Sequence, residues 1–374
     1  MRHLSSRWLM LLPMFTALAF AGCSSPQSRT GDGDDARRTG LLIEPDEAER
    51  VGYAVNWIST LDLPRRQQVT AVQVLDDLIV SLERPTNMIS AVSISDGRVL
   101  WRQVADGGSD PLYEPTRQGD RLYINSSSQL FTLDAYTGEV IAAADLPAAV
   151  DTGHTLVDGR ALFGAVNGRV FAVDLESGQV RWSKQLSARI SVPPADADTT
   201  TLAVDDSGRY AMYDTTDGTL LWYGRTFGRN GAAPAIGEDT VYIPSYDQTL
   251  YALSRATGRD RWTYRTTVPL TTGPMLVRDT LMLLIPEQDK VVALDAEDGS
   301  VRWEFDDLAI PATTPRDDRI LMATPQRLRL VRFADGQTLD DAQTRPLLTA
   351  LPGPDHSLVL VGQDGRLIRL NPRR

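Results

Sequence analysis

VDLESGQVRW (173–182) returns 40 residues later as YDTTDGTLLW (213–222). Both stretches carry a β-rich run, a turn that ends in glycine, and a tryptophan four residues after that glycine. Related stretches recur along the 374-residue chain: ISDGRVLW (94–101), LDAYTGEVIA (133–142), LSRATGRDRW (253–262), LDAEDGSVRW (294–303) and VRFADGQTLD (331–340). Successive turn glycines are 41, 40, 40, 40, 41 and 37 residues apart. This period predicts a repeat architecture with one supersecondary unit in each repeat.

Residues 120–143 indicate the structure of one unit. DRLYIN (120–125) and QLFTLD (129–134) are rich in β-formers and are separated by three serines, so two strands and a turn are expected. Gly138 closes the next turn, where it supplies the positive φ that other residues avoid, and EVIAAA (139–144) follows as another strand. A unit of about 40 residues fits four short antiparallel strands, which is the size of a β-propeller blade.

The two ends of the repeat region complement each other. YAVNWISTLD (53–62) resembles the last strand of a blade, but no inner strands precede it. SLVLVG (357–362) and RLIRLN (366–371) resemble inner strands, and the chain stops before an outer one. Pairing the two ends leaves no open edge between blades. Seven internal units and this composite blade predict an all-β, eight-bladed propeller over residues 51–374.

The tryptophans downstream of residue 50 all occupy one repeat position. They are Trp57, Trp101, Trp182, Trp222, Trp262 and Trp303, and Ala142 and Asp340 replace tryptophan in two units. A row of indoles is either an aromatic platform for a ligand or a structural contact between blades. The recurrence favours the contact, because an interface that repeats in every blade needs the same side chain each time.

The first 22 residues have the features of a targeting segment, with two arginines before an apolar run that is too short to span a membrane comfortably. The run ends in Ala-Gly before Cys23, the only cysteine, which resembles a bacterial lipoprotein signal. We therefore expect cleavage after residue 22, a lipid on Cys23 and a flexible tether over residues 23–50. Ser24 favours the outer membrane, facing the periplasm. The alternative is an ordinary cleaved signal.

Charge and cysteine content limit the function classes. The formal net charge is −11, and removing the two arginines of residues 1–22 gives −11 − 2 = −13. Such an acidic chain is a poor candidate for binding nucleic acid or anionic lipid headgroups. One cysteine allows no intramolecular disulfide, so stability must come from a packed core.

A blade that reads L-Y-A-L-D-x-x-T-G-x-x-x-W resembles the repeat of the pyrroloquinoline quinone (PQQ)-type propellers, and the resemblance covers nearly all of residues 52–374. A lipoprotein signal, a tether and a bare ring are similar to the BamB family within that group. Members of this family are lipoprotein subunits of the outer-membrane β-barrel assembly machinery, bind its central barrel protein and are not enzymes. The resemblance implies an envelope scaffold without cofactors that works as a monomer within a complex.

A local match implies a binding site. BamB-type proteins bind their partner with a loop of the form L-x-L-R-G-x-S-A-P between two mid-chain blades and with an aspartate in the next hairpin. The corresponding stretch here is RTFGRNGAAP (225–234), in which Arg229 and Pro234 match and Phe227 is a departure, and Asp247 lies in the next hairpin. Phe227, Arg229 and Asp247 are therefore the candidate partner-binding residues. The alternatives are that the proline is a feature of the fold and that Arg229 pairs internally with Asp247.

Other functions remain as alternatives. Quinoprotein dehydrogenases share the repeat and hold a quinone and Ca²⁺ over the axis, but many carry a vicinal disulfide, and this chain has no second cysteine. His154 and His356 stand alone, and the sequence has no phosphate loop or serine elbow. We therefore expect no catalytic centre and no metal site. A propeller lipoprotein with another envelope partner is the remaining possibility.

Overall fold

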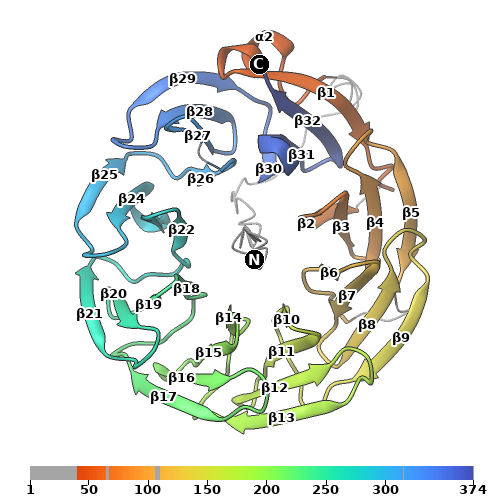
Figure 1. Ribbon diagram of the computed structural model, residues 1–374. Helices are drawn as coiled ribbons and strands as arrows, with labels where there is room; N and C mark the ends of the chain where they lie inside the picture. The colour runs from red at the N-terminus through yellow and green to blue at the C-terminus, as the bar shows by residue number, and fades with distance from the viewer. Residues whose placement is uncertain (1–39, 65–66, 106–109, 315, 374) are drawn as a thin grey trace, which may run out of the picture.

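The computed structural model describes residues 40–64, 67–105, 110–314 and 316–373. They form eight four-stranded antiparallel sheets that are arranged as blades around a central axis (Figure 1). The predicted all-β, eight-bladed propeller is therefore confirmed. Each blade begins with a short strand near the axis and ends with a strand at the rim (Figure 1).

The blades are numbered here along the chain. Blades 1 to 4 are β2 (Gln68–Leu75), β3 (Leu78–Arg84), β4 (Met88–Ser93), β5 (Val99–Val104); β6 (Thr116–Gln118), β7 (Arg121–Asn125), β8 (Gln129–Asp134), β9 (Val140–Asp145); β10 (Thr155–Val157), β11 (Arg160–Gly164), β12 (Arg169–Asp174), β13 (Val180–Gln185); and β14 (Ala195–Ala197), β15 (Thr200–Val204), β16 (Arg209–Asp214), β17 (Leu220–Arg225). Blades 5 to 7 are β18 (Ala235–Ile236), β19 (Thr240–Ser245), β20 (Thr249–Ser254), β21 (Asp260–Arg265); β22 (Met275–Val277), β23 (Thr280–Ile285), β24 (Lys290–Asp295), β25 (Val301–Phe305); and β26 (Ile310–Pro311), β27 (Arg319–Ala323), β28 (Arg327–Arg332), β29 (Thr338–Gln343).

Blade 8 closes the ring with strands from both ends of the chain. It comprises β30 (Leu347–Pro352), β31 (Leu358–Gly362), β32 (Arg366–Pro372) and, at the rim, β1 (Tyr53–Thr60). β1 runs antiparallel to β32, from Tyr53 opposite Pro372 to Thr60 opposite Arg366. The predicted pairing of the two ends is confirmed. The inner strand β30 was not recognised from the sequence.

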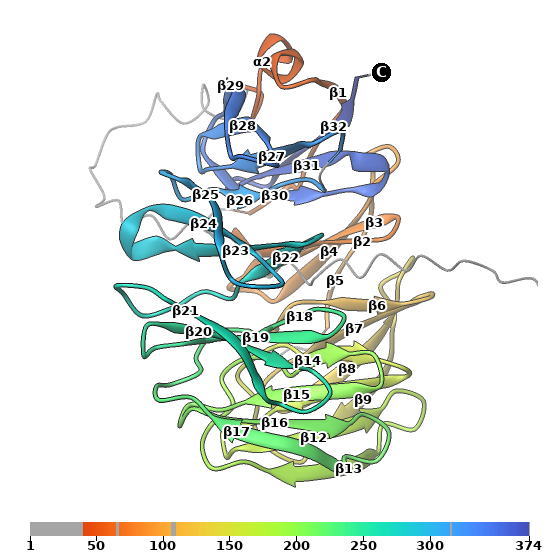
Figure 2. The same ribbon diagram turned by 60° about the vertical axis from the view of Figure 1, so that its left-hand side comes forward.

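The folded part of the chain reaches back to Gly40, so the predicted tether over residues 23–50 needs correction. Helix α2 (Pro45–Arg50) lies against β1 and β29 (Figures 1 and 2). Leu42, Ile43 and Ala48 are buried, because their apolar side chains extend the core between blades 7 and 8. The predicted signal of residues 1–22 and the lipid site Cys23 lie outside the described residues. In the part of the chain that the structure describes, no helix is long and apolar enough to span a membrane.

The core lies between the blades. The middle strands are buried on both faces because a neighbouring blade covers each face. Phe163 of β11 and Phe171 of β12, for example, are both fully buried, and their rings stack with centroids 5.3 Å apart. Burial of this kind contributes about 25 cal/mol for each Å² of apolar surface, so the blades stabilise one another.

Each of the six tryptophans joins its blade to the next. The indole nitrogens of Trp57, Trp101, Trp182, Trp222, Trp262 and Trp303 donate to the carbonyl oxygens of Ile94, Ala135, Thr215, Arg255, Ala296 and Phe333, respectively, over 2.8 to 3.3 Å. The turn glycine of the next blade lies against the ring. A Cβ atom on Gly138, whose φ is +74°, would stand 2.4 Å from Trp101. Glycine is thus required both for the turn and for the contact.

Candidate partner-binding site

The three candidate residues lie together at the boundary between blades 4 and 5. Phe227 and Arg229 belong to the crossing loop, residues 226–234, which runs from the outer strand β17 of blade 4 to the inner strand β18 of blade 5. Asp247 lies in the hairpin turn between β19 and β20 of blade 5. The repeat architecture forces this proximity, because every outer strand must return to the axis beside the hairpin of the next blade.

Asp247 holds the crossing loop against the hairpin. Its Oδ2 accepts hydrogen bonds from the backbone N–H of Phe227 (2.9 Å) and from the Tyr251 hydroxyl (2.6 Å), and its Oδ1 accepts one from the N–H of Thr249 (3.1 Å). Burial and the Asp247 carboxylate raise the pKa of Tyr251 to about 12, so the hydroxyl remains a donor. Gly228 permits the close approach, since a Cβ there would stand 2.5 Å from the Asp247 nitrogen. Both carboxylate oxygens of Asp247 are therefore engaged within the protein.

Phe227 projects from this fixed backbone into solvent. Its side chain is 94% exposed, although a phenyl ring is normally buried. The loop behind it is well anchored: the Thr226 hydroxyl bonds to the Gly228 carbonyl (2.8 Å) and to the Asn230 side chain (2.7 Å), and Asn230 is fully buried. The result is an apolar side chain held at a defined place with no cover from the described residues.

Arg229 pairs with a different acid from the one that the sequence suggested. Its Nη2 lies 3.1 Å from Oδ2 of Asp206, in the β15–β16 hairpin of blade 4, and its guanidinium lies 5.5 Å from the ring centroid of Tyr246. The Arg229 side chain is 44% exposed, so this ion pair contributes only about 0–1 kcal/mol. The alternative of an internal Arg229–Asp247 pair is therefore incorrect. Among the described residues, no acceptor bonds to Nε or Nη1 of Arg229.

Arg189 repeats this arrangement one blade earlier, and sequence reasoning missed it. It follows the end of β13 by four residues, as Arg229 follows the end of β17, and it forms an ion pair with Asp151. Its carbonyl accepts the N–H of Asp206 at 2.9 Å, as the Arg229 carbonyl accepts the N–H of Tyr246 at 2.9 Å. The stretches LSAR (186–189) and TFGR (226–229) carry the signal in the sequence. The two arginines form a row across consecutive loops on one face of the ring.

The two histidines have structural surroundings. His154 is buried, with Nδ1 2.8 Å from Asn125 Oδ1 and Nε2 2.6 Å from Thr116 Oγ1. Burial lowers the pKa of His154 to about 3, so the ring is neutral. His356 Nδ1 lies 3.0 Å from the Thr314 hydroxyl. Within the described ranges, no three side chains of His, Cys, Asp or Glu come together in a way that could hold a metal ion.

Comparisons with known proteins agree with this architecture. The crystal structure of BamB from Moraxella catarrhalis is similar, with 19% sequence identity and a TM-score of 0.66, over 85% of this chain and 99% of that one. The computationally designed Ika8 protein is similar at 14% identity and a TM-score of 0.68, over 83% of this chain and 98% of that one. No curated protein matches the sequence. At these identities the structural likeness shows the fold alone.

The family assignment rests on the sequence model. The family of the outer membrane protein assembly factor BamB matches residues 55–189, 126–229, 166–320 and 226–373, in overlapping segments that together span almost the whole ring. A match of this extent covers far more than half of the chain. The chain belongs to the family of the outer membrane protein assembly factor BamB.

Proposed function

We propose that this protein is a non-catalytic scaffold of the cell envelope that binds protein partners during the assembly of outer-membrane β-barrel proteins. Its family and the exposed crossing loop support this role. The proposal includes a lipid on Cys23 that anchors the chain to the outer membrane, with the ring in the periplasm. Protein binding needs no cofactor, so we assign none.

The observation that carries the proposal is the pairing of a fixed backbone with free side chains. Hot spots of protein interfaces are enriched in aromatic residues and arginine, and preorganised loops lose little entropy on binding. Phe227 is fully presented, while Arg229 and Arg189 keep about half of their side-chain surface exposed, at 44% and 49%. An acidic partner surface with an apolar pocket would complement this face.

The test is capture of a barrel-assembly component by the lipidated protein, isolated from cross-linked envelopes. Phe227→Ala is expected to reduce capture at least tenfold, because truncation of a hot-spot aromatic costs about 2 kcal/mol or more. The melting temperature should not change, since the ring contacts solvent rather than core. Ile58→Ala on β1 is the matched control, because Ile58 is also exposed, at 49%, but lies on the closing blade.

A charge reversal tests the arginine separately. Arg229→Glu is expected to abolish capture, because the partner's acidic surface would then face a carboxylate. Arg98→Glu is the matched control, since Arg98 pairs with Asp96 (2.6 Å) and is 79% exposed in a turn of blade 1. If the parent captures its partner and Phe227→Ala and Arg229→Glu capture it equally well, the site is wrong. If even the parent captures no barrel-assembly component, the proposed function is wrong.

A further inference from the structure

Blade 2 departs from the pattern that joins the other blades. Ala142 stands on β9 at the position where six units carry tryptophan. Ala142 is exposed, whereas five of the six indoles are buried and that of Trp262 is half-buried. The cross-strand row Tyr123–Thr132–Ala142 of blade 2 corresponds in register to the row Tyr242–Ala252–Trp262 of blade 5. The position of a missing indole is therefore well defined.

The groups that would contact this indole are present but unused. In the six tryptophan interfaces, the carbonyl three residues before the next turn glycine accepts the indole N–H. The equivalent group for blade 2 is the Leu175 carbonyl, ahead of Gly178, and no donor among the described residues bonds to it. A Cβ on Gly178 would meet only the Ala144 side chain, at 3.1 Å, in place of an indole ring.

Tyr123 gives a second sign of an incomplete contact. In blade 5, the Tyr242 ring lies 5.7 Å from Trp262, and its hydroxyl donates to the Ala296 carbonyl at 2.8 Å. The Tyr123 side chain is nearly buried, at 4% exposure, yet its hydroxyl has no hydrogen-bond partner in the described part of the chain. Blade 2 therefore lacks both the indole and the hydrogen bond that accompany this tyrosine in blade 5.

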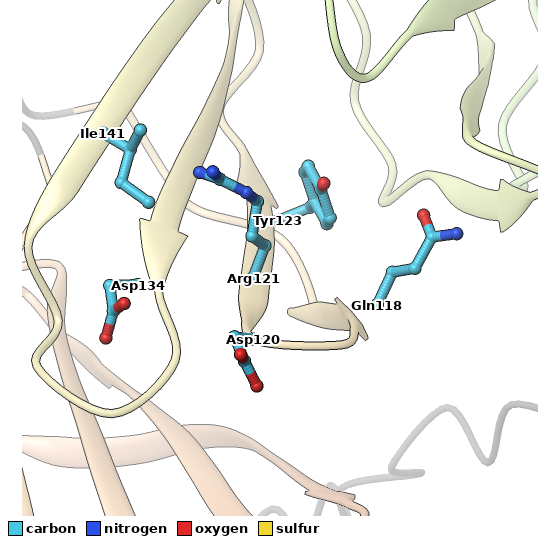
Figure 3. Close-up of a pocket in the computed structure, with 6 residues that line it drawn as sticks. All are labelled: Gln118, Asp120, Arg121, Tyr123, Asp134 and Ile141. Atoms are coloured by element: carbon cyan, nitrogen blue, oxygen red, sulfur yellow. The ribbon is translucent and has the colours of Figure 1, made fainter.

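A recess lies on this face of blade 2. Its volume is about 460 Å³, which is within the range of about 300–1,000 Å³ typical of ligand sites. The lining residues are Gln118, Asp120, Arg121, Tyr123, Asp134 and Ile141. Figure 3 shows the guanidinium of Arg121 between Ile141 and Tyr123, with the two carboxylates nearer the turns. An aromatic ring placed here would meet a tyrosine face and a cation, both of which favour it.

We propose that this recess binds the tryptophan side chain of an extended segment from another protein. The indole N–H would donate to the Leu175 carbonyl, and the ring would lie against Tyr123 and Arg121. An extended segment fits because β9 is the outer edge strand of its sheet, with backbone groups available for pairing. Its sequence VIAAAD (140–145) carries charge only at Asp145, and its three alanines allow a second chain to approach closely. This site is distinct from the crossing loop of the proposed function.

The first experiment fills the recess from within. Ala142→Trp is expected to raise the melting temperature by at least 1 °C, because its indole should make the contacts that the other six make. Ala143→Trp is the matched control, since Ala143 is the next residue of β9, is also exposed and points to the opposite face. A lower melting temperature for Ala142→Trp than for Ala143→Trp would show that the recess does not accept an indole, and would overturn the proposal.

The second experiment measures binding with ¹⁹F NMR of two probes: an extended octapeptide that carries one 5-fluorotryptophan, and N-acetyl-5-fluorotryptophan amide. The peptide resonance should shift saturably with the parent, Ala143→Trp and Phe227→Ala, and should lose at least tenfold in affinity with Ala142→Trp. The peptide should bind at least tenfold more tightly than the amide. No saturable binding to the parent, or equal binding to Ala142→Trp, overturns the site, and equal affinity of the two probes overturns the polypeptide occupant. Because Phe227→Ala tests the crossing loop, failure here is distinguishable from failure of the proposed function.

Discussion

Two glycines with the same backbone conformation test how much the indole contacts contribute. Gly138 and Gly159 have φ of +74° and +72°. An added Cβ would stand 2.4 Å from the Trp101 ring at Gly138 and would meet nothing within 4 Å at Gly159. Replacing each glycine with alanine therefore imposes the same backbone strain at both positions, but a collision at only one of them.

The expected magnitudes differ clearly. A left-handed conformation costs an alanine about 1–2 kcal/mol, and the lower entropy of the unfolded chain offsets about half of this. Gly159→Ala should thus reduce the free energy of unfolding by about 1 kcal/mol. Gly138→Ala adds an overpacking cost of about 1–3 kcal/mol. It also strains the 2.9 Å bond from Trp101 to Ala135, worth about 1 kcal/mol, so about 3–5 kcal/mol is expected in total.

The assay is urea unfolding followed by circular dichroism, with midpoints compared at unchanged m-value. In a Trp101→Ala background, the collision is absent, so Gly138→Ala should cost about 1 kcal/mol, as at Gly159. The coupling energy of this double-mutant cycle should be about 2–3 kcal/mol. The reasoning is refuted if Gly138→Ala costs no more than Gly159→Ala, or if removing the indole leaves its cost unchanged.

Four further outcomes are expected. Deleting residues 367–374 should lower the melting temperature of the whole ring in one cooperative transition, because β1 loses its partner; a parent-like melting curve would contradict this. Burial holds the pKa of His154 at about 3, below its unfolded value of 6.5, so the unfolded state takes up a proton first as the pH falls, and urea midpoints should decline from pH 6.5 by up to about 1.4 kcal/mol per pH unit; a flat profile for this contribution, isolated by comparison with His154→Gln, would count against it. Burial, with a contribution from Asp198, raises the pKa of Asp196 to about 6, so the folded state binds the proton more tightly and Asp196→Asn should stabilise the protein at pH 7 by about 1–2 kcal/mol after allowance for solvent screening, with no gain below pH 4. Cys23→Ser should release the protein from the membrane fraction; sedimentation after a high-salt wash would reject the lipid anchor.

The fold was predictable because one geometric requirement recurs in every unit. Gly97 and its equivalents must have positive φ and must accept the indole of the preceding blade, so glycine and tryptophan keep a fixed spacing that is visible without an alignment. Closure was predictable for a related reason. YAVNWISTLD (53–62) contains the tryptophan of a rim strand, and no other blade was left to receive it.

Two features were not predicted. The helix over residues 45–50 carries local signals, with Pro45 at its start, Asp46 and Glu47 in its first turn and Arg50 in its last. Its six residues are too few for a periodic pattern, and packing against β1 and β29 stabilises it. The contact between Arg229 and Asp206 depends on how consecutive loops cross neighbouring hairpins. Spacing along the chain places an acid in both the preceding and the following hairpin and does not distinguish them.

The pairing of β1 with β32 sets the order in which the molecule can form. Every other blade is made from one continuous stretch, so its strands can meet as soon as they are synthesised. Closing the ring spans about eight times the length of one repeat, which adds about 2 kcal/mol of loop-closure entropy over that of a single blade. β1 is the first strand made and the last to find its partner, because β32 ends at Pro372. An incomplete chain therefore has two unpaired edges, and its release before the C-terminus is made would leave an open, aggregation-prone arc rather than a smaller ring.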